Sequence, residues 1–330
     1  MKAALVRRFG PLEEVSVVDV PDPEPGPGEV VVDVAAAEVN YPDLLVIEGR
    51  YQVRPPLPFA PGKAAAGHIA ALGPGVAHLA LGQAVAVQVE YGAYAEKLRA
   101  PASACFPLPA GIPFDEAAAL GLAYQTAWFA LKERAGFQPG EIVLVLGASG
   151  GIGTASIQLA RVFGAKAVIG GVRGAANAAF ARRAGADHVI DLAESNLYDA
   201  LPRRIRALTE GHGADIVIDP LGGEVTAAAL RALAWCGRLV IVGFAAGEIP
   251  IIRANYLLVK NIAVFGLQWS DYRDRAPQRV AEVQQELFRL HVAGQIRPVI
   301  SRRLPLTDFK DALRAFRNGP VQGKMILTMR

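Results

Sequence analysis

Residues 142–163 constrain the fold of this chain more than any other stretch. Ile142 to Leu146 is an unbroken apolar run rich in branched side chains, as in a strand buried on both faces of a parallel sheet. A glycine-rich turn follows, and apolar residues then recur at helical spacing up to Phe163. Strand, glycine turn and helix in this order are the context that a dinucleotide-binding fingerprint requires. The stretch therefore predicts nucleotide binding.

The turn itself carries a variant of the G-x-G-x-x-G pattern, with Ala148 in the place of the first glycine. Gly150 would let the backbone approach a pyrophosphate closely, and Gly153 would let the helix pack on the strand. The free N–H groups at the start of the helix, near Gly151 and Ile152, would face the anion.

The same alternation of strands and helices continues after the turn. Strand-like runs are predicted at residues 166–172, 188–191, 215–219, 238–244 and 262–267, with helices at 175–184, 196–209 and 225–234. Together with residues 142–146 these runs give six strands. The predicted fold class is therefore α/β, with a doubly wound parallel sheet.

The first third of the chain has a different pattern, with short strands and turns rich in proline and glycine. Strands are predicted at 2–6, 15–20, 29–37, 63–72, 84–89 and 94–98, with a short helix from Asn40 to about Glu48. One long helix, 114–135, is expected to lead into the second domain. After residue 270, helices at 278–290 and 308–316 and a strand at 324–329 are expected to return to the first domain. The predicted domains are 1–122 with 270–330, and 123–269.

Composition excludes several classes of function. Of 330 residues 52% are hydrophobic, and the net charge is only +3 without a long basic run, so binding to nucleic acid or an acidic membrane is not implied. The 2 cysteines cannot form a disulfide framework or a four-cysteine zinc lobe. No apolar run reaches the ~18 residues that span a bilayer, and no signal core follows Met1. We expect a soluble cytoplasmic protein.

The end of the second strand of the nucleotide domain indicates which cofactor is bound. No Asp or Glu occurs between Thr154 and Ala186, whereas an NAD site needs an acid there for the ribose hydroxyls. Arg173 stands at this position and could pair with a 2′-phosphate at two points. We therefore predict NADPH as the cofactor. The alternative is that Arg173 is only a solvated loop residue.

Several motifs, in this order and spacing, resemble a known family over nearly the whole chain. Residues 185–191 (Gly-Ala-Asp-His-Val-Ile-Asp), 219–223 (Asp-Pro-Leu-Gly-Gly) and 237–244 resemble the medium-chain dehydrogenase/reductase superfamily. Residues 39–43 (Val-Asn-Tyr-Pro-Asp), 92–96 and 323–327 resemble its zinc-free quinone oxidoreductase (ζ-crystallin-like) branch. The resemblance implies a GroES-like β-rich catalytic domain, a Rossmann domain, a cleft between them and hydride transfer from NADPH to a conjugated carbonyl. It also implies a homodimer, which we expect to pair the edge strands near 262–267.

The residues at the zinc positions of the alcohol dehydrogenase branch argue against a catalytic metal. Asn40 stands where that branch has a cysteine, and Gly62-Lys63-Ala64 replaces Gly-His-Glu. An amide, an ammonium and a methyl group do not form a zinc site. We predict that no metal is bound.

The resemblance also assigns residues to the substrate. Tyr51 matches the tyrosine that related enoyl reductases use near the substrate, so it is the candidate proton donor, with Asn40 as a second catalytic candidate. Tyr41, Asp43, Tyr91 and Tyr124 are expected to contact the substrate. The alternatives are that Tyr51 is a surface loop aromatic and that Tyr41 and Tyr124 are packing residues.

A larger set is expected to contact the cofactor, by the fingerprint, by position at strand ends or by resemblance. These residues are Thr126, Ala148, Ser149, Gly150, Gly151, Ile152, Gly153, Gly171, Arg173, Val242, Gly243, Phe244, Leu267, Gln268, Trp269 and Lys324.

Three functions remain open on the sequence. The first is an NADPH-dependent quinone or enone reductase. The second is an enoyl-thioester reductase of the same fold. The third is a non-enzymatic NADPH-binding protein, because crystallins of this family accumulate as structural proteins.

Overall fold

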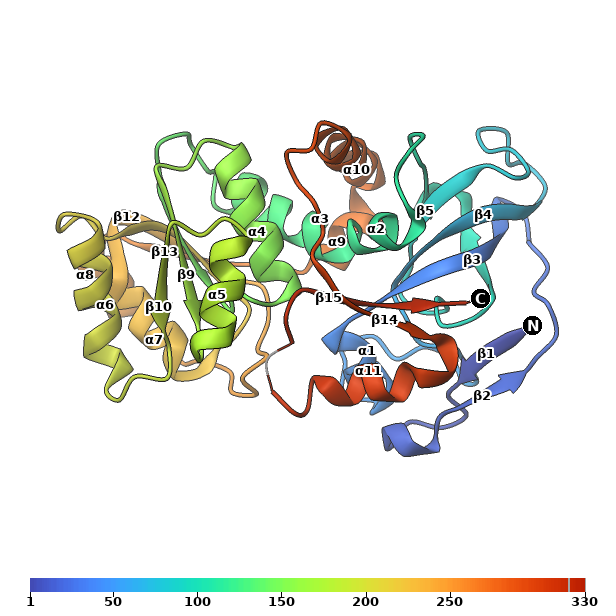
Figure 1. Cartoon of the computed structure of the whole chain (residues 1–330), viewed down its shortest axis with the longest axis horizontal. Coiled ribbons are helices and arrows are strands. Elements are labelled where there is room, and N and C mark those ends of the chain that lie inside the picture. Colours follow the sequence, from blue (N-terminus) through green and yellow to red (C-terminus); the bar gives the residue numbers. More distant parts are fainter. Residues whose placement is uncertain (320, 330) are drawn as a thin grey trace. The chain divides into compact units, whose positions relative to one another are not determined.

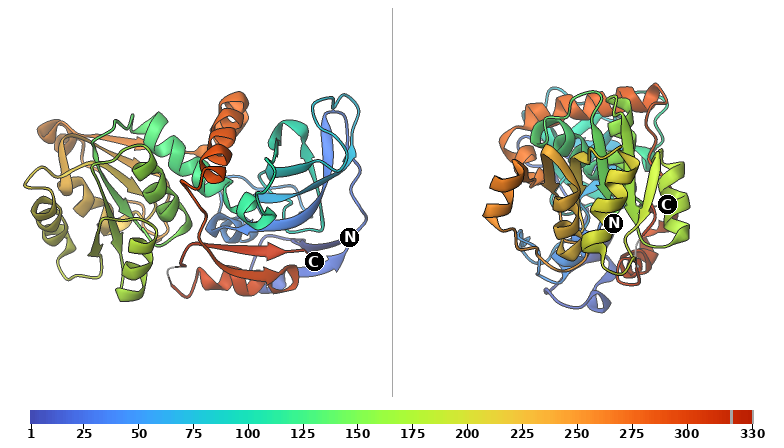
Figure 2. Two further views of the ribbon diagram at one scale, coloured as in Figure 1. Left: turned by 45° about the horizontal axis from the view of Figure 1, so that its top comes forward. Right: turned by 90° about the vertical axis from the view of Figure 1, so that its left-hand side faces the viewer.

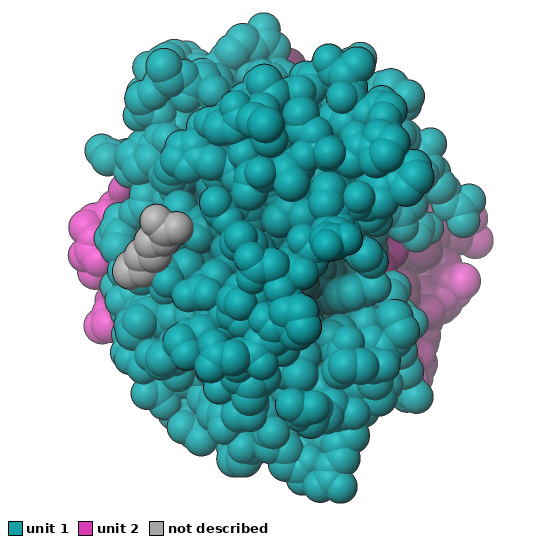
Figure 3. Space-filling view, turned by 90° about the vertical axis from the view of Figure 1, so that its right-hand side faces the viewer, with its two compact units in different colours: residues 1–122, 270–330 teal, residues 123–269 magenta. Residues whose placement is uncertain are grey.

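The computed structural model describes residues 1–319 and 321–329. The chain forms two compact units, residues 1–122 with 270–330 (unit 1) and residues 123–269 (unit 2), shown in teal and magenta in Figure 3. Unit 2 is a single continuous stretch of chain, and unit 1 is made from the stretches that precede and follow it.

Unit 2 contains a six-stranded sheet in which every neighbouring pair is parallel. Its strands are β8 (Ile142–Leu146), β9 (Ala167–Val172), β10 (His188–Asp191), β11 (Ala214–Asp219), β12 (Leu233–Ile241) and β13 (Ala263–Gly266). Their order is β10-β9-β8-β11-β12-β13, so the chain runs outward from β8 first in one direction and then in the other. The predicted doubly wound parallel sheet is confirmed, and β13 is its edge strand as expected.

Helices cover both faces of this sheet (Figures 1 and 2). Helices α4 (Gly151–Val162) and α5 (Ala175–Arg183) pack on one face, and α6 (Leu197–Leu208) and α7 (Gly223–Ala232) pack side by side on the other. The core beneath α6 and α7 contains Leu144, Leu146, Ile169 and Val217, all fully buried. Helices on both faces explain the apolar sequences of the central strands, because neither face of these strands meets solvent.

Unit 1 is organised around the long strand β3 (Glu29–Val39). One side of β3 pairs along its length with β4 (Ala64–Leu72), and the other side is shared by β6 (Lys97–Pro101) and β15 (Lys324–Thr328). The seven-stranded sheet has the order β14-β15-β3-β4-β5-β7, with β6 paired to β3, so the last strand of the chain lies inside it. The remaining strands of this sheet are β5 (Ala84–Gln88), β7 (Cys105–Pro107) and β14 (Ile300–Pro305).

The other elements of unit 1 surround this sheet. They are the antiparallel pair β1 (Lys2–Leu5) and β2 (Ser16–Asp19), and the helices α1 (Tyr41–Ile47), α2 (Phe114–Ala119), α9 (Trp269–Arg275, from Ser270 on), α10 (Pro277–Val292) and α11 (Phe309–Ala315). No helix in the described part of the chain has both the length and the hydropathy to cross a membrane.

The single helix expected at 114–135 was wrong. It is divided into α2, α3 (Leu122–Phe129) and a π-helical turn over Ala130–Arg134. The break falls at Gly121, where a Cβ atom would lie 3.3 Å from Ala64 Cβ and 3.2 Å from the Ala118 carbonyl oxygen. Tight packing against β4 therefore sets the break, although the helix formers on either side favour continuation.

Candidate functional site

The glycine turn of unit 2 has the conformation that its sequence predicts. Gly150 is the N-cap of α4 with extended backbone, and the first N–H groups of the helix have no carbonyl partner within it. At Gly153 a Cβ atom would lie 2.2 Å from the Gly147 carbonyl oxygen and 2.7 Å from Ala148 Cα, so no other residue fits. Gly147 has φ +60°, which also favours glycine. The turn can thus present bare backbone and a helix dipole to a phosphate.

The turn lies at the carboxyl end of β8, beside the point where the strand order reverses. Ligands of open α/β sheets bind at this edge and at this point. Val242, Gly243 and Phe244 follow the end of β12, and Leu267, Gln268 and Trp269 follow β13. Phe244 is 39% exposed, whereas the side chains of Leu267 and Trp269 are buried. The strand ends therefore offer both exposed and packed candidates for cofactor contacts.

Arg173 follows directly on the last residue of β9 and is exposed. Its carbonyl oxygen accepts a hydrogen bond from Asn177 Nδ2 at 2.9 Å. Gly174 comes next with φ +82°, and α5 begins after it. Its exposure leaves the guanidinium accessible, and its contact with a ribose phosphate stays a prediction.

The structure brings one acid to this position that the sequence analysis missed. Asp191 ends β10 and is paired in register with Val172 of β9. Its Oδ1 atom accepts hydrogen bonds from the Ala193 N–H at 2.9 Å and from the Gly174 N–H at 3.4 Å. The search for an acid between Thr154 and Ala186 could not find Asp191, because strand register and not sequence distance places it there. Arg173 and Asp191 thus lie at the same end of two neighbouring strands, β9 and β10.

Three of the predicted residues have structural partners within unit 2. Gly171 lies inside β9, where a Cβ would come within 3.2 Å of Leu192 and its carbonyl accepts the Ala148 N–H at 3.1 Å. Tyr124 is 1% exposed and its hydroxyl donates to Gln158 Oε1 at 2.7 Å. Thr126, on the same helix α3, is buried as well. Their contacts with ligands stay predictions.

In unit 1, Asn40 and Asp43 form the centre of a buried polar cluster. Asn40 Oδ1 accepts from Lys324 Nζ at 2.6 Å, and Asn40 Nδ2 donates to Glu38 Oε2 at 3.0 Å. Asp43 Oδ2 accepts from the Asn40 N–H and from the Tyr94 hydroxyl, each at 2.8 Å. Lys324 also pairs with Glu38 at 2.6 Å. The amide of Asn40 and the ammonium of Lys324 thus already have partners inside unit 1.

Burial changes the acidity of this cluster. Asp43 is 1% exposed, and desolvation raises its pKa from 3.8 to about 6, although the Lys63 ammonium and the two hydrogen bonds act in the opposite direction. Desolvation likewise raises the pKa of Glu38 against the attraction of Lys324. Burial and the neighbouring Asp43 carboxylate raise the pKa of Tyr94 well above 10.0. The cluster can therefore hold or release a proton near neutral pH at Asp43.

Lys63 connects Tyr51 to this region, a connection that the sequence does not reveal. Its ammonium is 5% exposed, pairs with the Glu90 carboxylate, and lies 4.5 Å from the centroid of the Tyr51 ring. Tyr51 itself is partly buried against the core of unit 1. The sequence indicated only that Lys63 stands where related enzymes have a zinc-binding histidine, because no local periodicity links Lys63 to Glu90 or to Tyr51.

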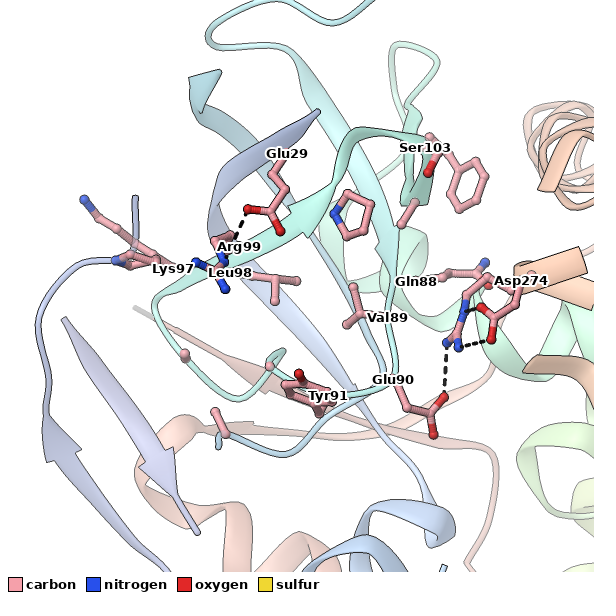
Figure 4. Close-up of a pocket in the computed structure, with 18 of the residues that line it drawn as sticks. Glu29, Gln88, Val89, Glu90, Tyr91, Lys97, Leu98, Arg99, Ser103 and Asp274 are labelled. Atoms are coloured by element: carbon pink, nitrogen blue, oxygen red, sulfur yellow. Dashed lines mark hydrogen bonds and ion pairs between the residues drawn. The ribbon is translucent and has the colours of Figure 1, made fainter. Parts of the chain in front are cut away.

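The two other aromatic candidates of unit 1, Tyr41 and Tyr91, have different neighbours. Tyr41 meets Phe316 edge-on with centroids 6.2 Å apart. Tyr91 is 38% exposed and lines a hollow of about 750 Å³ in unit 1 (Figure 4). Arg99 and Glu29 form an ion pair at one end of this hollow, and Glu90 and Arg273 form another. Its charged groups are thus largely paired with one another.

The side chains at the former zinc positions do not suit zinc. Asn40 and Lys63 offer an amide and an ammonium, each engaged by an acid or a lysine of unit 1. Among residues 1–319 and 321–329, no three His, Cys, Asp or Glu side chains come together as a metal-binding group. The absence of a metal stays a prediction.

Known protein families match parts of both units. The zinc-binding dehydrogenase family matches residues 151–286, and the alcohol dehydrogenase GroES-like domain matches residues 26–110. The quinone oxidoreductase-like protein 2 homolog of Nematostella vectensis is 36% identical over 92% of this chain and 82% of its own length. Escherichia coli quinone oxidoreductase, solved in complex with NADPH, superposes with a TM-score of 0.90 at 29% identity over 99% of this chain and 100% of that one. A mycobacterial protein solved in complex with NADPH superposes with a TM-score of 0.92 at 30% identity, again over 99% and 100%.

Proposed function

This chain belongs to the medium-chain dehydrogenase/reductase superfamily, in its quinone oxidoreductase branch, and we propose that it is a zinc-independent, NADPH-dependent reductase of quinones or α,β-unsaturated carbonyl compounds. The observation that carries the proposal is the turn between β8 and α4, where only glycine fits at position 153, together with Arg173 directly after the end of the neighbouring strand β9. Relatives solved with NADPH support the same cofactor.

The residues of unit 2 fit a dinucleotide. The backbone of residues 147–153 and the start of α4 would hold the pyrophosphate, and Arg173 would hold the 2′-phosphate. Bound NADPH would supply a hydride, which is two electrons with one proton. This chain would supply orientation, the exclusion of water and a proton for the reduced acceptor.

Tyr51 is the proposed source of that proton. Hydride addition to a conjugated carbonyl leaves negative charge on oxygen, which must be stabilised or protonated. Tyr51 is half-buried and lies against a buried cation, whereas the Tyr94 hydroxyl already donates to Asp43. Asn40, Tyr41, Asp43, Tyr91 and Tyr124 remain proposed substrate contacts. The residues of the turn and of the strand ends, together with Thr126 and Lys324, remain proposed cofactor contacts.

Turnover assays with matched acceptors test the proposal. NADPH oxidation would be followed with 1,4-benzoquinone, 9,10-phenanthrenequinone and a crotonyl thioester, and each assay repeated with NADH. Reduction of the quinones with NADPH supports the proposal. Turnover of the thioester alone indicates an enoyl-thioester reductase, and tight NADPH binding without turnover of any acceptor indicates a non-enzymatic role.

We also propose a homodimer formed at the β13 edge of unit 2. Helix α8 (Ala254–Lys260) directly precedes β13 in the chain, and its Leu258 and Val259 are 79% and 77% exposed. Exposed apolar side chains beside an open sheet edge favour association. Leu258→Glu should halve the mass measured by analytical ultracentrifugation. The matched control Val292→Glu, at a 60% exposed position of α10, should leave it unchanged. A cytoplasmic location stays a prediction.

A further inference from the structure

A lysine ammonium is buried in unit 1 at the entry to β4. Lys63 precedes Ala64, and its side chain is only 5% exposed. Its Nζ atom donates to the Glu90 carbonyl oxygen at 3.2 Å and pairs with the Glu90 carboxylate. Burial of a lysine requires such compensation, since an unpaired ammonium would lose its charge. A carboxylate and a carbonyl oxygen of the same residue thus hold the Lys63 Nζ atom in a fixed position.

The counter-ion of Lys63 is shared with a second cation. Glu90 Oε2 pairs with Arg273 Nη1 at 3.2 Å, and Arg273 pairs in turn with Asp274 at 2.8 Å (Figure 4). Because one carboxylate serves two cations, it does not fully cancel the field of Lys63. The ammonium also acts on Asp43, whose pKa it lowers against the effect of burial.

The ammonium also lies over the face of an aromatic ring. Lys63 Nζ lies 4.5 Å from the centroid of Tyr51, within the range of a cation–π interaction. Such a contact fixes the ring, and it becomes stronger if the phenol loses its proton, because the ring and its oxygen then carry negative charge. The charged groups around the pair are Asp43 from α1, Glu90 from the segment after β5, and Arg273 from α9.

We propose that Lys63 is a positioning residue that holds the Tyr51 ring and stabilises its phenolate. The inference rests on the proposed function for its use. Bound NADPH would supply the hydride, and the enolate of the reduced acceptor would then need one proton. The O–H bond of Tyr51 breaks, its electron pair stays on the phenolate, and a C–H bond forms on the enolate. A proton from water then restores the phenol.

The direct test measures the ionisation of Tyr51 without any reaction. The protein would be labelled with tyrosine carrying ¹³C at the ring carbon next to oxygen, and Tyr51→Phe would assign the signal. An opposite charge within 4–6 Å moves a pKa by one to three units, and Glu90 shares part of that charge, so Lys63→Met should raise the Tyr51 pKa by about one unit. Lys63→Arg should restore it. The control Lys97→Met, which removes a cation paired with Asp22, should leave it unchanged.

A second variant keeps the test decisive if Lys63→Met does not fold. Glu90→Gln retains the ammonium and removes its counter-ion, so the pKa of Tyr51 should fall instead of rise. A Tyr51 titration that is the same in the wild type, Lys63→Met and Glu90→Gln overturns the inference. So does a shift of equal size in Lys97→Met.

The reaction gives a further readout. Lys63→Met should lower enone turnover roughly tenfold at neutral pH and move the pH profile upward by about one unit, with NADPH affinity retained. Unchanged turnover and pH profile in an active protein contradict the proton-transfer role. If the wild type reduces no acceptor, the proposed function fails, while the titration still decides whether Lys63 stabilises the Tyr51 phenolate.

Discussion

Asp43 should make unit 1 less stable as pH rises, which is the reverse of the usual behaviour of a carboxylate. Its pKa is about 6 in the folded protein, whereas the unfolded chain has the ordinary value of 3.8, so the folded state binds the proton more tightly. The stabilisation is fully present below pH 3.8 and is lost as pH rises through 6. A difference of about two units corresponds to roughly 3 kcal/mol, at 1.36 kcal/mol per unit.

The substitution Asp43→Asn isolates this contribution. The amide keeps an oxygen that can accept from the Tyr94 hydroxyl and the Asn40 N–H, but it does not titrate. The free energy of unfolding of the variant, minus that of the wild type, should therefore rise by about 2 kcal/mol between pH 4 and pH 7, because pH 4 already lies slightly above the ordinary pKa of 3.8. The variant is compared with the wild type because Glu116 also makes the stability depend on pH, and its contribution changes with pH in the direction opposite to that of Asp43. Burial opposes the effect of Arg297 and His291 there, but these partners still lower its pKa.

The assay must report on unit 1. All three tryptophans, Trp128, Trp235 and Trp269, lie in residues 123–269, so their fluorescence follows unit 2 and serves as an internal reference. Hydrogen exchange measured peptide by peptide over β3 and α1, and corrected for the intrinsic pH dependence, would follow unit 1. The matched control is Asp33→Asn, because Asp33 is an acid of the neighbouring strand β3 and its side chain is 44% exposed. A stability difference that is the same at pH 4 and pH 7 would refute the reasoning.

Three further predictions concern the cofactor and the metal. Arg173→Glu should weaken the binding of NADPH relative to that of NADH roughly ten- to a hundredfold in fluorescence titrations, since a charge-assisted contact is worth about 1.5–3 kcal/mol. Asp191→Asn should act in the opposite direction. An unchanged ratio of the two affinities in Arg173→Glu would show that Arg173 does not bind the phosphate. Gly150→Val should leave the circular dichroism spectrum intact and severely reduce NADPH affinity, because a branched side chain would stand where the pyrophosphate must meet bare backbone; normal binding would contradict the fingerprint. Elemental analysis of the purified protein should find no stoichiometric zinc, and one zinc per chain with activity lost to chelators would overturn the zinc-free assignment.

The parallel sheet could be predicted from the sequence because its determinants are local. Strands β8 and β9 are apolar runs, β11 is apolar from Ile216 to Ile218, and Gly153 is required by contacts within a few residues of itself. Helix α8 was not predicted because it is short and none of its residues is fully buried; only Tyr256 and Leu257 pack partly against the core of unit 2. Strands β7 and β14 were also missed. β7 is very short, and β14 has a single buried residue, Leu304.

The residues of the candidate site also differ in whether they could be predicted from the sequence. The glycine turn and Arg173 could be found because they lie at fixed offsets from one strand. Lys63, Glu90 and Arg273 are separated by 27 and 183 residues, and they come together only when unit 1 is complete. Asp191 reaches the Arg173 loop through the register of β10 on β9. Long-range pairing of this kind leaves no periodic signal in a single sequence.

The position of β15 has a consequence for how the protein is made. Residues 123–269 form a continuous unit, which is fully synthesised before the last strand of the other unit exists. Strand β15 pairs with the second half of β3, so on the ribosome the β3 edge from Ala36 to Val39 stays open until residues 324–328 have emerged. The Rossmann unit can therefore fold while the GroES-like unit still waits for its final strand. A chain that stops short of residue 324 would expose that edge to pairing with other nascent chains, so premature termination should produce aggregation rather than a truncated, partly active enzyme.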